Sequence, residues 1–194
     1  MSNDYLDNLK DDYYDEYIGD YDLNDSSTEW YGDTDAGSLD DPYNQILASY
    51  WICAMDGYPA SAYTEQGLNP TVGKFVPDEL AFYRYDITGD GVPELIICLY
   101  DEIDVALAVY TYDGNGGTTC IGQSDSDKIM WLFCDQCYAV YAVDSNGDKS
   151  DTEVYRFNKS GTKSTYIGKD DSQYWYIAAN VDMTNVTRFD EIVY

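Results

Sequence analysis

The sequence predicts an α+β fold: mainly an antiparallel β meander of hairpins, with one or two N-terminal helices packed on the sheet. Two observations lead to this class. One segment that begins near residue 41 has helical periodicity, whereas from Glu79 onward short aromatic strands alternate with turns rich in Asn, Asp and Gly. A helix followed by a run of hairpins is typical of an antiparallel sheet with helices on one side.

The helical segment runs from Asp41 to Met55. Asp41 is predicted as its N-cap and Pro42 lies in the first turn, where its missing N–H costs nothing. Gly57 is predicted to end the helix. The residues expected to face the sheet recur at helical spacing: Tyr43, Ile46, Leu47, Tyr50, Trp51 and Ala54. Prolines and glycines punctuate residues 58–78, so a long irregular connection is expected there.

Three later segments share one pattern, an aromatic strand that runs into an Asx/Gly turn. They are residues 109–116, 140–147 and 154–161, and their unequal spacing favours hairpins over a solenoid repeat. The continuous apolar run Leu95–Tyr100 predicts a central strand covered on both faces, and residues 128–133 predict another. About eight strands are expected in all.

The most informative stretch is the loop at residues 86–94. It has carboxylates at its first, fifth and ninth positions, which are Asp86, Asp90 and Glu94, and the hydroxyl of Thr88 at its third. Calcium takes six to eight oxygen ligands at flexible geometry, so this spacing predicts a calcium site. The alternative is a polar β-turn in which the glycines supply positive φ and the acids are solvated.

The loop is not an EF-hand, because position twelve is Ile97 and not a bidentate Glu, and its flanks are strands. It resembles the calcium loop of the FG-GAP and VCBS families. That resemblance implies side-chain ligands at Asp86, Asp90 and Glu94 and a backbone carbonyl ligand at Val92. Thr88 departs from the usual Asp or Asn, which implies a weaker site. Residues 85–96 are also similar to a group of secreted or lipid-anchored proteins of Gram-positive gut bacteria.

Charge divides the chain into two parts. Residues 1–40 hold thirteen acids and one Lys, which predicts an acidic, Tyr-rich disordered tether, and residues 41–194 are predicted to form one α+β domain. The whole chain of 194 residues has 37 acidic and 10 basic residues and a formal charge of −27. That charge disfavours nucleic acids and anionic membranes and leaves proteins and glycans as partners. The oligomeric state is open.

The expected location is extracellular or anchored at the cell surface, because external calcium is plentiful. We expect that a secretion signal or lipid anchor originally preceded this sequence and that Met1 replaces it. The alternative is an acidic protein of the cytosol. No stretch is apolar and long enough to span a bilayer. Five cysteines leave at least one thiol unpaired.

Two other motifs were considered as sites. Residues 144–148 repeat the start of the cation loop but have Lys149 at the sixth position, which favours a plain hairpin turn. The pair Cys134 and Cys137 is expected to flank a turn, with a structural zinc as the alternative.

The chain has no histidine, so most catalytic dyads and triads are excluded. The sequence therefore predicts a calcium-binding surface module that binds protein or glycan, with an acid-only, glycoside-type hydrolase as the alternative.

Overall fold

The computed structural model describes residues 41–192 except 113, 115–116 and 144–148. Contacts divide the chain into two units, residues 1–39 and 40–194, and the described residues all belong to the second. The predicted tether at residues 1–40 lies outside the described residues. Within them, a nine-stranded antiparallel sheet and two α-helices make the fold α+β and mostly β.

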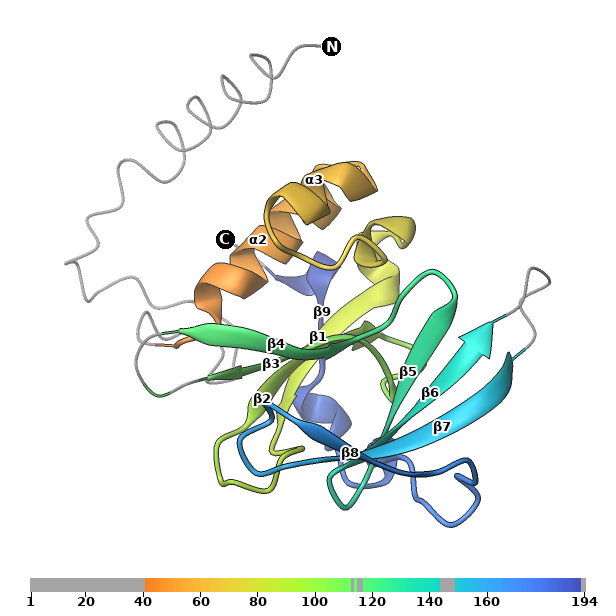
Figure 1. The fold of residues 1–194 in the computed structure, drawn as a ribbon. Helices are drawn as coiled ribbons and strands as arrows, with labels where there is room; N and C mark the ends of the chain where they lie inside the picture. The colour runs from red at the N-terminus through yellow and green to blue at the C-terminus, as the bar shows by residue number, and fades with distance from the viewer. Residues whose placement is uncertain (1–40, 113, 115–116, 144–148, 193–194) are drawn as a thin grey trace. The chain divides into compact units, whose positions relative to one another are not determined.

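The sheet runs in the order β8-β7-β6-β5-β3-β2-β1-β9, and β4 pairs with β3 beside this path (Figure 1). Most neighbours in the sheet are also neighbours in sequence. The strands are β1 (Leu80–Tyr85), β2 (Glu94–Leu99), β3 (Val105–Tyr112), β4 (Thr118–Gln123), β5 (Lys128–Phe133), β6 (Cys137–Val143), β7 (Lys149–Phe157), β8 (Ser164–Gly168) and β9 (Thr187–Arg188).

The predicted central strand is confirmed as β2, which lies between β1 and β3 and is buried along nearly its whole length. Its neighbour β3 has an edge that serves two partners. Ala108–Tyr112 pair with β4, and Val105 and Ala106 pair with β5, while β2 pairs with the other edge. The sheet therefore divides at β3. The three repeated aromatic segments are confirmed as the first strands of the hairpins β3–β4, β6–β7 and β7–β8.

One face of the sheet holds an apolar core. Side chains from β1, β2, β3, β5 and β7 meet there with four from segments outside the strands. The buried members are Ala81, Tyr83, Ile87, Ile96, Cys98, Ile103, Ala106, Val109, Met130, Leu132, Phe157, Ile177 and Val186. These residues come from both parts of the divided sheet. The core therefore joins the two parts into one domain.

Two helices, α2 (Asn44–Met55) and α3 (Ala60–Glu65), lie together on one side of the strands β1 to β4 (Figure 1). The Tyr50 hydroxyl lies 2.9 Å from that of Tyr110 on β3, and Trp51 Nε1 donates to the Phe189 carbonyl at 3.1 Å. As predicted, Gly57 follows the helix end with a φ of +64°. Its N–H and that of Tyr58 close a Schellman motif on Ala54 and Cys53.

Two sequence predictions about this region are wrong in detail. Helix α2 begins at Asn44, and no side chain caps it, because the Asp41 carboxylate accepts from the Tyr43 N–H and pairs with Arg84. The expected irregular connection at 58–78 contains α3, which starts after Pro59, and the 3₁₀ turns η2 (Val72–Lys74) and η3 (Pro77–Glu79). Proline before the first helical residue is compatible with a helix start, so these prolines did not exclude one.

The buried side chain of Asn69 fixes this connection to the sheet. Its Nδ2 donates to the Leu107 carbonyl at 2.5 Å and to the Ser124 carbonyl at 2.8 Å, and its Oδ1 accepts from the Thr71 N–H at 2.9 Å. The Asn69 N–H also donates to the Tyr50 hydroxyl. One amide therefore satisfies polar backbone groups of β3, of the segment after β4 and of its own loop.

We expect Asn69→Ala to lower the free energy of unfolding by about 2 to 4 kcal/mol, because it leaves two buried carbonyls and one N–H without this partner. Urea denaturation followed by tryptophan fluorescence measures the change. Asn185→Ala, at an exposed position, is the matched control and should change stability by less than about 0.5 kcal/mol. Equal small effects of both substitutions would contradict the role given to Asn69.

Candidate functional site

The candidate site is the loop that joins β1 to β2. Asp86 organises its first half: Oδ1 accepts from the N–H groups of Gly89 at 2.7 Å and Asp90 at 3.1 Å, and Oδ2 accepts from Gly91 at 2.9 Å. Gly89 and Gly91 have φ values of +71° and +93°, which L side chains rarely adopt. The loop therefore curls tightly around the carboxylate of its first residue.

Glu94 closes the loop from the first position of β2, and its side chain is completely buried. Oε2 accepts from the N–H groups of Ile87 at 3.0 Å and Thr88 at 3.2 Å. Oε1 accepts from the hydroxyls of Thr88 at 3.3 Å and Thr111 at 3.0 Å. A carboxylate offers about four acceptor positions, so four protein donors satisfy it.

Burial raises the pKa of the Glu94 carboxyl above its ordinary value. The hydrogen bonds from Thr111 and the Thr88 backbone oppose that shift, whereas the charges of Asp90 and Asp86 increase it. The four donors are therefore needed to keep a charged group in this position, because an ionised carboxylate without partners is costly to bury.

The five predicted ligands are not in equivalent positions. Thr88 and Glu94 are fully buried, Asp86 is half-buried, and Asp90 and Val92 are exposed at the outer end of the loop. Asp90 Oδ1 accepts from the Val92 N–H at 2.7 Å. In the described part of the chain, no three His, Cys, Asp or Glu side chains are grouped closely enough to hold a metal ion. Asp90 therefore faces solvent, whereas the Asp86 carboxylate is enclosed by the N–H groups of the loop and Glu94 lies in the interior.

Two other hairpin turns lie against this loop. A Cβ at Gly89 would collide with the side-chain amide of Gln136, in the turn between β5 and β6. A Cβ at Gly161, in the turn between β7 and β8, would lie 2.9 Å from Ile121 Cδ1 and 3.3 Å from Thr88 Cγ2. The loop is thus enclosed by residues far away in sequence. No local pattern could have indicated Gln136, Gly161 or Thr111 as its neighbours.

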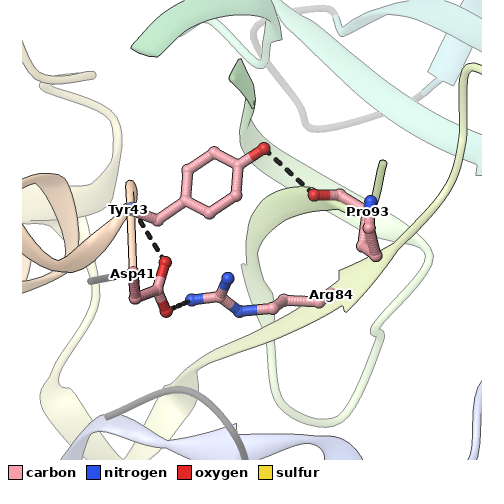
Figure 2. A network of polar contacts seen from close by, with 4 residues as sticks. All are labelled: Asp41, Tyr43, Arg84 and Pro93. Atoms are coloured by element: carbon pink, nitrogen blue, oxygen red, sulfur yellow. Dashed lines mark hydrogen bonds and ion pairs between the residues drawn. The ribbon is translucent and has the colours of Figure 1, made fainter. Parts of the chain in front are cut away.

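The segment before α2 holds the two strand ends that border the loop (Figure 2). Asp41 forms an ion pair with Arg84 of β1, and the guanidinium lies 5.0 Å from the centre of the Tyr43 ring. The Tyr43 hydroxyl donates to the Pro93 carbonyl at 3.0 Å, directly before β2. One short segment therefore contacts both strands, and it limits how far the ends of the loop can separate.

The other motifs do not form a second site in the described residues. Cys134 and Cys137 flank the turn between β5 and β6, as predicted, with Asp135 and Gln136 at φ values of 62° and 66°. All five cysteines are free thiols. The second Asp-rich segment, residues 144–148, lies outside the described residues. Trp131 packs with Tyr141 and Tyr176, so it belongs to an aromatic cluster and not to an exposed platform.

Comparison with known proteins gives no relatives: no family model, curated protein or solved structure matches this chain. Among the described residues there is no helix with the length and apolar character needed to cross a membrane.

We expect Thr111→Val to destabilise the calcium-free protein by about 1 to 2 kcal/mol, because it keeps the side-chain shape but removes one donor from the buried Glu94 carboxylate. Chemical denaturation in the presence of a chelator measures this loss. Thr119→Val provides the control, because Thr119 is the exposed cross-strand partner of Thr111 on β4. If the two substitutions had equal effects, the Thr111 hydroxyl would not support Glu94.

Proposed function

We propose that this protein is a calcium-binding module of the cell exterior, in which the loop at residues 86–94 holds the ion and the β-meander with its helices forms a surface for a protein or glycan ligand. The observation that carries the proposal is the placement of Asp86 and Asp90 in the same part of the loop. The Asp90 N–H donates to Asp86 Oδ1, so two acidic residues are held in one tight turn of a chain of charge −27. A divalent cation would relieve their repulsion.

The oxygen donors of the loop fit a hard cation. Asp86 Oδ2 accepts one described hydrogen bond and Asp90 Oδ1 accepts one, so acceptor positions remain on both side chains within the described residues. Carboxylate, hydroxyl and carbonyl oxygens are the ligands that calcium prefers, and the loop offers no sulfur or nitrogen side chain. Asp86 and Asp90 would hold the ion, with the Val92 carbonyl as a further donor.

Glu94 can take part only through Oε1. Its two partners there are hydroxyl groups, whose hydrogens turn about a single bond, whereas the two N–H donors to Oε2 are fixed by the backbone. Turning one hydroxyl hydrogen away would free an acceptor position on Oε1 and a lone pair on the hydroxyl oxygen. Thr88 would then complete the proposed set of Asp86, Thr88, Asp90, Val92 and Glu94.

We expect calcium to stabilise the protein and to raise its melting temperature. Extracellular sites have Kd values on the order of 0.1 to 1 mM, so millimolar calcium should add about 1 kcal/mol, or roughly 2 to 4 °C for a chain of this size. Asp90→Asn should abolish the shift, because it removes one of the two paired charges. Differential scanning fluorimetry of chelator-treated protein measures the shift, and titration calorimetry measures the heat of binding.

Asp101→Asn is the matched control, because Asp101 is exposed and lies outside the loop, and it should leave the calcium shift unchanged. Magnesium at the same concentration should have a smaller effect, because it requires a near-ideal octahedral site. A wild-type protein that gives neither heat nor a shift with calcium would make the loop a polar turn held by Asp86 and Glu94.

A further inference from the structure

The turn end of the β7–β8 hairpin is locally basic in a strongly acidic chain, although Asp151 and Glu153 lie earlier on β7 and Asp170 and Asp171 follow Lys169. Residues 155–169 contain four of the ten basic residues and no Asp or Glu. These four residues, Arg156, Lys159, Lys163 and Lys169, are all exposed. In the described part of the chain, ion pairs form only at Arg84 and Arg188, so the four cations have no carboxylate partner there.

The outer edge of β8 is open. This strand ends the sheet, and among the described residues only β7 pairs with it. An edge strand presents unpaired N–H and C=O groups to any extended chain that lies beside it. The lysines bracket this edge, since Lys163 directly precedes β8 and Lys169 directly follows it. Arg156 pairs with Thr165, the second residue of β8, and its Nε donates to Cys137 Sγ on β6.

A row of tyrosines leads across the sheet to the same edge. Tyr138, Tyr155 and Tyr166 are cross-strand partners on β6, β7 and β8. The Tyr138 and Tyr155 rings are stacked with centroids 5.3 Å apart, and Tyr155 meets Tyr166 edge to face at 5.6 Å. The outermost ring, Tyr166, is 50% exposed. A side chain from an added strand could extend this row, because aromatic side chains favour cross-strand partners.

We propose that the open edge of β8 binds an acidic polypeptide segment in extended conformation, which adds to the sheet as a further strand. Its backbone would pair with β8, its carboxylates would meet Lys163 and Lys169, and an apolar or aromatic side chain would contact Tyr166. The charge of −27 does not prevent this, because at physiological salt charges more than about 8 Å away are largely screened. The β8 edge is not part of the loop at residues 86–94, although the turn before β8 lies against that loop at Gly161, and the binding requires no calcium.

Two other occupants fit less well. A second copy of β8 would place four positive charges against four, which is the means by which charged edges avoid self-pairing. An acidic glycan would use the positive charges but not the unpaired backbone groups of the edge. One face of Tyr155 is also already covered by Tyr138, so the row offers a sugar mainly the ring of Tyr166.

The test uses the full chain with a chelator present and a labelled peptide that alternates glutamate with valine and tyrosine. Fluorescence anisotropy should show binding that weakens as salt is added, and hydrogen exchange should show new protection at residues 164–168. The double substitution Lys163→Glu with Lys169→Glu should weaken binding about tenfold or more, because it reverses both charges that bracket the edge. Lys74→Glu with Lys128→Glu makes the same change in net charge at exposed positions elsewhere and should change binding less than about twofold.

Two further probes separate strand addition from simple charge attraction. A peptide of the same sequence with alternate backbone nitrogens methylated keeps its charge but loses its pairing groups, and it should not bind. Polygalacturonate, an acidic glycan, should bind more weakly than the peptide. The proposal is overturned if the wild-type chain does not bind the peptide, if the methylated peptide binds equally well, if polygalacturonate binds more tightly, or if the control double variant loses as much affinity.

Discussion

The buried carboxylate of Glu94 is the constraint on which the central part of this domain depends. A charge in the interior must be matched by donors, and here they come from two places: the loop at Ile87 and Thr88, and the neighbouring strand at Thr111. This arrangement fixes the conformation of the loop and its position against β3 at the same time. The half-buried Asp86 and the exposed Asp90 are held in the same tight turn by the Asp90 N–H, which donates to Asp86 Oδ1.

The surroundings of the loop increase this rigidity. Tyr43 and Asp41 hold the strand ends on one side, and the turns that contain Gln136 and Gly161 lie against the loop itself. Under the proposed function, a loop closed in this way would lose little conformational entropy on binding an ion, and this would compensate in part for a ligand set in which a hydroxyl replaces a carboxylate. Local sequence and distant packing therefore contribute to the same site.

The elements with strong local patterns could be predicted from sequence. The run Leu95–Tyr100 predicts β2, and Gly57 predicts the end of α2, because burial and positive φ leave clear signals in neighbouring residues. The start of α2 was predicted wrongly, since Asp41 meets Arg84, a residue 43 positions away. The loop pattern indicates which oxygens are available, but the burial of Glu94 and its bond from Thr111 depend on strand pairing. The division of the sheet at β3 is likewise a tertiary feature without a local pattern.

The pairing of β9 with β1 has a consequence for the synthesis of the chain. Phe82 pairs with Thr187, about a hundred residues later, and Phe189 packs edge to face against Phe82. As the chain leaves the ribosome, β1 can pair with β2 early, but its other edge stays open until residues 187–189 have been made. During that interval the apolar edge at Leu80–Phe82 is a surface on which nascent chains could associate, so the C-terminal segment protects against aggregation as well as completing the fold.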